Sequence, residues 1–93
     1  MIKSFVPKDA ERIWKGEFTR RLPPDIQHVI RRKLRMLNNA TTLADLAASP
    51  SNNLEQLKGD RKGQYSIRVN DKWRICFVWK DGDSYEVEVV DYH

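Results

Sequence analysis

The apolar residues of this chain change their spacing once, near residue 50, and this change constrains the fold more than any other feature. Before that point they recur every three to four residues, as on one face of a helix; after it they alternate, as on one side of a strand. Helices followed by strands, with short connections, predict an α+β fold. We expect a small antiparallel sheet, allowing for a mixed edge, with two or three helices packed on one face. The length of 93 residues suits one core, so 1–93 is expected to form a single domain.

The segment 24–39 is the clearest predicted helix. Proline is common in a first helical turn, and the apolar residues then form one stripe at helical spacing. The stripe consists of Ile26, Val29, Ile30, Leu34 and Leu37. Shorter helices are predicted at 9–18 and at 42–48, the second with Thr42 and Asp45 in a capping-box arrangement. A short edge strand is expected at 1–5.

Alternating residues predict strands at 54–59, 63–69, 73–79 and 84–90. Because successive side chains of a strand face opposite sides, the odd positions, Tyr85 included, should form the core face and the even positions an open face. Arg68, Arg74 and Tyr92 should then share one solvent-facing surface, provided that no bulge intervenes. Lone Cys76 reads as a small packing residue, and a single cysteine excludes an internal disulfide.

Charge is distributed unevenly along the chain. Residues 1–80 contain all seventeen Lys and Arg against eight acids, whereas residues 81–93 contain five acids and no Lys or Arg. A compact basic domain attracts polyanions, so RNA, DNA or an acidic protein is a candidate partner. No run of eighteen apolar residues and no signal-peptide pattern is present, which favours the cytoplasm.

The open face and the terminus together contain the groups that metal-free RNA cleavage requires. The 2′-hydroxyl of RNA can attack the neighbouring phosphorus if a base, a cation and an acid are provided. Arg74 suits the phosphate, and His93 suits the acid because Asp91 and the α-carboxylate favour its protonated form. Alternatively, Arg68 and Arg74 pair across strands with the glutamates 86 and 88, Tyr92 packs at an interface, and the sheet binds polyanions without catalysis.

Three stretches of the sequence, "MIKSF", "LKGDRKGQYSIRVNDKWRICFVW" and the terminal "DYH", resemble the HigB branch of the RelE toxin superfamily along the whole chain. The resemblance implies a bacterial type II toxin that enters the ribosomal A site and cuts mRNA without a metal or other cofactor. It also implies a HigA-type helix-turn-helix antitoxin as partner, and no direct DNA binding without that antitoxin.

Site residues follow from the resemblance position by position. Lys58, Arg74, Asp91, Tyr92 and His93 match catalytic residues of the pattern. Glu55 stands where the HigB pattern has a histidine, three residues before the lysine. Some RelE-fold relatives use a glutamate as base, so Glu55 is assigned that role. A carboxylate is the weaker base unless it is desolvated, so a solvated strand glutamate is the alternative reading.

Further basic residues are candidates for RNA contacts. Arg61 and Lys62 flank the motif, Arg68 lies on the open face, and the arginines 31, 32 and 35 should line the outward face of the helix 24–39. A solvated helix face explains these three equally well. Two rival functions remain open: a non-catalytic RNA- or ribosome-binding module, and a gyrase poison of the ParE kind, which shares the superfamily fold.

Overall fold

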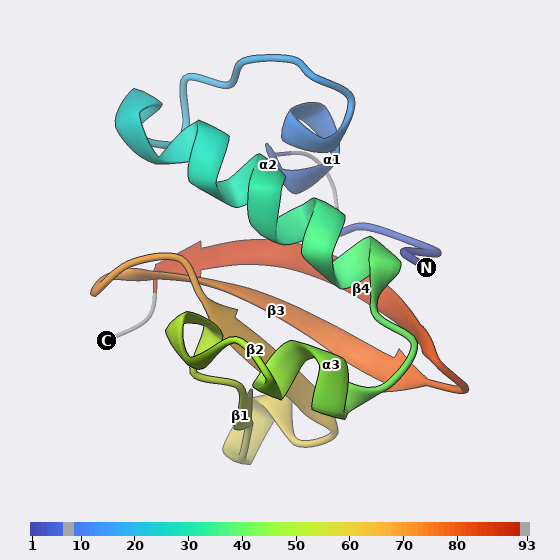
Figure 1. The fold of residues 1–93 in the computed structure, drawn as a ribbon. Helices are drawn as coiled ribbons and strands as arrows, with labels where there is room; N and C mark the ends of the chain where they lie inside the picture. The colour runs from blue at the N-terminus through green and yellow to red at the C-terminus, as the bar shows by residue number, and fades with distance from the viewer. Residues whose placement is uncertain (7–8, 92–93) are drawn as a thin grey trace.

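The structure, a computed structural model, describes residues 1–6 and 9–91 (Figure 1). Its helices are α1 (Asp9–Trp14), α2 (Pro24–Asn39) and α3 (Leu43–Ala47), with the 3-10 turns η1 (Pro50–Asn52) and η2 (Gly59–Arg61). Its strands are β1 (Glu55–Gln56), β2 (Gln64–Arg68), β3 (Trp73–Lys80) and β4 (Asp83–Asp91). They form one antiparallel sheet in the order β1-β2-β3-β4. The α+β prediction is confirmed.

Helix α2 has the predicted bounds and buries the predicted stripe. Ile30, Leu34 and Leu37 are fully buried, and they join a core that includes Ile75 and Phe77 of β3. Full burial of such a side chain stabilises the fold by about 1.5–3 kcal/mol relative to exposure. Helices α1 and α2 therefore cover one face of the sheet (Figure 1). None of the helices in the described ranges is long and apolar enough to cross a bilayer.

Helix α1 is shorter than the predicted 9–18 because Gly16 stops it. Gly16 has φ +84°, a left-handed conformation that glycine adopts easily. The amide of Glu17 donates to the carbonyl of Arg12 at 2.8 Å, and the amide of Gly16 donates to that of Ile13 at 3.0 Å. This pair of bonds is a Schellman motif, which satisfies the last carbonyls of a helix.

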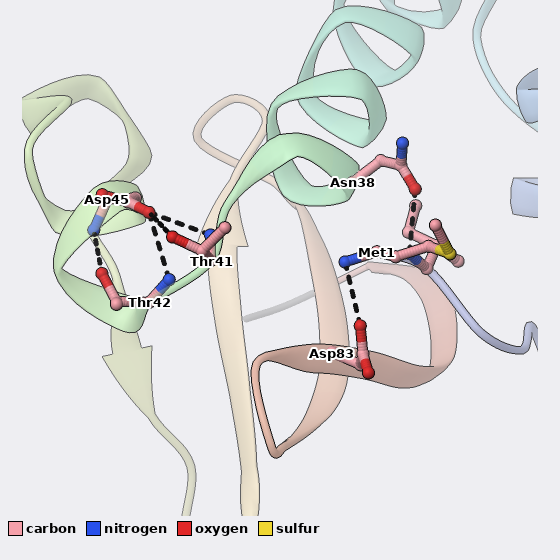
Figure 2. A network of polar contacts seen from close by, with 7 residues as sticks. Met1, Asn38, Thr41, Thr42, Asp45 and Asp83 are labelled. Carbon is pink, nitrogen blue, oxygen red and sulfur yellow. Dashed lines mark hydrogen bonds and ion pairs between the residues drawn. The ribbon is translucent and has the colours of Figure 1, made fainter.

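Helix α3 begins with the predicted capping box (Figure 2). The Thr42 hydroxyl accepts from the Asp45 amide at 3.2 Å, and the Asp45 carboxylate accepts from the Thr42 amide at 3.1 Å. That carboxylate also accepts from the amide of Thr41 at 2.9 Å. The backbone donors of Thr41 and Thr42 hold the pKa of Asp45 below its usual value. Leu46 of this helix is fully buried in the same core as α2.

The predicted edge strand at 1–5 is wrong as a regular strand, although the segment does lie along β4. It makes only isolated parallel bridges, at Ile2 with Ser84 and at Phe5 with Val87. The amide of Ile2 donates to the Asn38 side chain of α2 at 2.9 Å, as Figure 2 shows. The bridges attach the segment at two points along β4, and the bond to Asn38 attaches it to α2.

A bulge in β4 overturns part of the predicted alternation. Cys76 is opposite Glu88, but Val78 is opposite Tyr85, so Phe77 faces two residues of β4 where a regular ladder would give it one. The extra residue is Glu86, at φ +52°. Tyr85 therefore shares the open face with Val78 and is not a core residue as predicted. After the bulge the prediction holds, and Glu88 lies on the open face.

Candidate functional site

The open face of the sheet, the face turned away from α2, presents two rows of side chains across the strands. The first row runs through directly opposed residues, one on each strand: Glu55, Ser66, Cys76 and Glu88. The second row consists of Arg68, Arg74 and Val90. We call the polar residues of these rows, together with Asn53, whose backbone carbonyl contacts Arg74, the open-face cluster.

Arg74 is the centre of the open-face cluster and is only 6% exposed. Its Nε donates to Ser66 Oγ at 2.7 Å, and its terminal nitrogen Nη2 donates to the carbonyls of Asn53 at 2.6 Å and Ser66 at 3.3 Å. The same nitrogen lies 3.9 Å from the Glu55 carboxylate. Several acceptors thus fix the guanidinium in one orientation, as a planar donor fork requires.

Glu55 lies beside Arg74, in the position expected of a general base. It stands on β1 directly opposite Ser66, and its side chain is 42% exposed. A carboxylate that is open to solvent and close to a fixed guanidinium can accept a proton from a group bound at that guanidinium. The structure therefore brings Glu55 and Arg74 together as predicted, while their chemical roles stay predictions.

Arg61 pairs with Glu88 at the other end of the first row. Its Nη1 lies 2.7 Å from the Glu88 carboxylate and donates to the Gln64 side chain at 3.0 Å. The pair is about one-third exposed, so its net contribution to stability is small. Within the first row, between Ser66 and Glu88, Cys76 is fully buried, and burial raises the pKa of its thiol. The packing role predicted for Cys76 agrees with this.

Other predicted basic residues lie around the cluster. Lys58 precedes η2 and Lys62 follows it, and both are exposed. Arg68 is directly opposite Arg74 but pairs with Asp71 in the β2–β3 turn. The alternative in which both arginines pair with glutamates of β4 is thus wrong: Arg68 binds Asp71, and the glutamate near Arg74 is on β1.

Helix α2 does not contribute to this face. Its residues Arg31 and Arg35 lie on the layer across the sheet from Arg74, since α2 packs on the core face. Arg31 was expected to point outward, yet it is half-buried and its Nε donates to the Ile13 carbonyl of α1 at 3.1 Å. Arg35 is exposed as expected. These arginines therefore cannot share a phosphate-binding surface with Arg74.

The end of β4 runs beside Arg74. Val90 is directly opposite Arg74, and Asp91 is opposite Trp73, with its carboxylate 3.7 Å from the Lys72 ammonium. The last described residues of β4 thus lie beside Arg74 and its neighbour Trp73 on β3. The predicted catalytic residues Tyr92 and His93 lie outside the described residues.

Two components of the site were not predicted. Ser66 was assigned only to the open face, and Asn53 was not considered; each supplies an acceptor to Arg74. The parity of Ser66 relative to Arg74 was a usable signal, because diagonal neighbours on one face lie within reach of long side chains. No sequence signal exists for Asn53, whose backbone carbonyl makes the contact.

The fold and this cluster define a small basic α+β protein with a cluster of polar side chains on the open face of its sheet. A family model described as RelE-like toxin of type II toxin–antitoxin system HigB matches residues 3–93. The chain therefore belongs to the HigB-like toxin family. As a toxin of a toxin–antitoxin system it has an antitoxin as its partner.

Curated relatives agree with this membership. The chain is 39% identical over 83 residues to Toxin HigB-1 of Vibrio cholerae, a match that covers 88% of this chain and 87% of the relative. It is 36% identical over 93 residues to Endoribonuclease HigB of Proteus vulgaris, with both chains fully covered. The resemblance inferred from the sequence motifs is thus confirmed.

Solved structures share the fold at low identity. The toxin–antitoxin complex YoeB–YefM of Staphylococcus aureus contains a chain that matches with a TM-score of 0.62 at 20% identity, covering 100% of this chain and 95% of that one. The YoeB/ParE toxin of Agrobacterium tumefaciens matches with a TM-score of 0.51 at 17% identity, covering 99% and 96%. At these identities the likeness establishes the fold.

Proposed function

We propose that this chain is an mRNA endoribonuclease that acts in the ribosomal A site, without a metal, by promoting attack of the RNA's own 2′-hydroxyl. The single observation that supports the chemistry best is the buried guanidinium of Arg74, held in place with the Glu55 carboxylate 3.9 Å away. The full-length match to a relative named Endoribonuclease HigB supports the same activity. We take 1–93 as one toxin domain, in keeping with the family match over 3–93.

Each reacting group has a candidate residue. Glu55 removes the proton of the 2′-hydroxyl, and Arg74 stabilises the charge that develops on the pentacoordinate phosphate. His93 is assigned to donate a proton to the leaving 5′-oxygen, and Asp91 and Tyr92, which precede it in the sequence, are assigned as further catalytic residues. Lys58 adds positive charge at the start of η2, next to the strand that carries Glu55.

Substrate RNA is bound by cations around the cluster. Lys62 is exposed beside η2, Arg61 pairs with Glu88 at one end of the first row, and Arg68 belongs to the second row. An arriving phosphate competes with Glu88 for Arg61 and with Asp71 for Arg68. Arg31 and Arg35 are assigned instead to a separate contact with ribosomal RNA, on the opposite layer. The partner is a HigA-type antitoxin, and the toxin acts in the cytoplasm, where translation occurs.

The test is cleavage of mRNA on programmed ribosomes by purified protein. The expected products carry a 2′,3′-cyclic phosphate and a 5′-hydroxyl, and His93→Ala is expected to lower the rate by about 10²–10⁴-fold, the usual value of one proton transfer. Lys15→Met, an exposed change on the other layer, serves as control. Inhibited translation with uncut mRNA would indicate a binding module, and altered DNA supercoiling with intact translation would indicate a gyrase poison. Either result would overturn the proposal.

A further inference from the structure

A buried lysine on α2 carries a charge that the proposed reaction does not use. Lys33 is 3% exposed, and its ammonium donates to Asn52 Oδ1 at 2.5 Å and to Ser51 Oγ at 3.1 Å. Both acceptors are neutral, and burial, with the nearby positive charge of Arg32 and Arg68, lowers the pKa of Lys33. Residues 1–6 and 9–91 provide no acidic partner for this ammonium. A buried charge without a counter-charge is expensive, so its presence in the fold calls for a reason.

The acceptors of Lys33 belong to the segment that also reaches Arg74. Asn52 is fully buried, and its Nδ2 donates to the Leu46 carbonyl at 2.9 Å and to Met36 Sδ at 3.0 Å. The oxygen and the nitrogen of its side chain are thus both bonded to α2, and the nitrogen also to α3. Asn52 therefore fixes the end of η1 as a rigid point.

The next residue, Asn53, directs the backbone toward Arg74. Asn53 adopts a left-handed conformation with φ +41° and ψ +58°, and its amide donates to the Pro50 carbonyl at 3.1 Å. This turn aims the Asn53 carbonyl at Arg74, 2.6 Å away. Two residues later the same segment becomes β1 and presents Glu55. One short segment, 50–55, thus supplies two of the groups around the guanidinium.

We propose that Lys33 and Asn52 are positioning residues of the open-face cluster, which hold the segment 50–55 from the α2 side so that the Asn53 carbonyl and Glu55 meet Arg74 in one geometry. The catalytic part of this proposal rests on the proposed function; the positional part does not. Neither residue touches the substrate, since Lys33 lies on the core-facing helix and both are buried. Their effect passes through the backbone of 52–55.

The positional part can be tested without any activity. In protein labelled with ¹⁵N, the Nε–H proton of Arg74 should exchange slowly with solvent, because it is buried and bonded to Ser66 Oγ. Lys33→Met keeps the length and apolar contacts of the side chain but removes its donors. We expect it to raise the exchange rate of that proton by about tenfold or more. Lys15→Met, at an exposed lysine of the α1 end, should leave the rate unchanged.

The catalytic part is tested in the ribosome assay with the same two variants. Lys33→Met is expected to lower kcat by about 10- to 100-fold, as a displacement of reacting groups does, while KM stays within about twofold. A purely structural role would lower the fraction of folded protein and leave kcat per folded molecule unaltered. Unchanged kcat with faster exchange at Arg74 overturns the catalytic part alone. Absence of cleavage by the wild type overturns the proposed function, and the catalytic part with it, while the exchange measurement still decides the positional part.

A milder variant covers the case in which Lys33→Met does not fold. Ser51 is exposed and supplies only one of the two acceptors of Lys33, so Ser51→Ala should fold normally. It should raise the exchange rate of the Arg74 proton by a smaller factor, about twofold to fivefold. An exchange rate equal to that of the wild type in this variant, or in folded Lys33→Met, overturns the positional proposal.

Discussion

Replacement of Ser66 by alanine tests how strongly the sheet holds the guanidinium of Arg74. The hydroxyl of Ser66 is fully buried and accepts from Arg74 Nε at 2.7 Å. The Ser66 carbonyl, which accepts from the same arginine at 3.3 Å, is a backbone group and stays in the variant. The substitution therefore removes one buried hydrogen bond to a charged donor and nothing larger than one oxygen atom.

The expected loss follows from that single bond. A hydrogen bond to a charged group contributes about 1.5–3 kcal/mol, and removal of one partner leaves the other's desolvation cost in place. We expect the free energy of unfolding to fall by about 2 kcal/mol. For a domain of this size that corresponds to a Tm lower by about 8–16 °C. In the ribosome assay kcat should fall as well, because Arg74 gains freedom to leave its orientation.

A second buried serine of the sheet provides the matched control. Ser84 is also 0% exposed, but among the described residues its hydroxyl has no hydrogen-bond partner. Ser84→Ala should thus be neutral or stabilising, by about 1 kcal/mol at most, because an unsatisfied hydroxyl leaves the interior. Urea unfolding and thermal scans of both variants measure the difference. Equal shifts for the two serines, or a loss below about 0.5 kcal/mol for Ser66→Ala, would refute the reasoning.

The remaining predictions concern the fold and the buried lysine. Leu34→Ala should lower the free energy of unfolding by about 2–5 kcal/mol, because Leu34 is fully buried in the core. Urea unfolding measures this loss, and a loss below about 1 kcal/mol would contradict the packing described. Thr42→Ala should cost about 1 kcal/mol through loss of the cap on α3, read from the same titration; an unchanged midpoint would contradict it. The folded-state pKa of Lys33 is lowered below its ordinary value of 10.5, so the unfolded state binds more protons in the window between the two values. The contribution of Lys33 to the free energy of unfolding should therefore rise with pH in that window, and Lys33→Met should abolish the rise. Urea titrations of both proteins at neutral and alkaline pH measure this. An identical pH dependence in the two proteins would refute it.

Much of the fold was predictable because local physics determines it. Helix α2 has the predicted bounds since its apolar stripe and its entry through proline act in the same direction. The capping box of α3 needs only Thr42 and Asp45 at the right spacing. The Schellman end of α1 was also local, and Gly16 was the signal that the predicted 9–18 helix passed over.

The site was only partly predictable, because its decisive contacts are tertiary. Alternation placed Arg74 on the open face, and family motifs selected Glu55, but neither indicated that Arg74 is buried. Its burial depends on the segment 50–55, whose path is set by Lys33 on a helix nearly twenty residues earlier. No sequence pattern singled out Lys33 on that helix. Long-range polar contacts of this kind leave no periodic trace in a sequence.

The bulge in β4 makes one residue of that strand dispensable for the register of the sheet. Loss of a residue from the middle of a strand normally moves every later side chain of that strand to the opposite face of the sheet. Here Glu86 is the surplus residue, so a chain lacking it would still align Tyr85 with Val78 and Glu88 with Cys76. The disturbance would fall on the outer edge, where the Glu86 amide donates to the Ser4 hydroxyl. Related chains that are one residue shorter at this point can therefore keep the same side chains on the same sides, with only the first few residues docked differently.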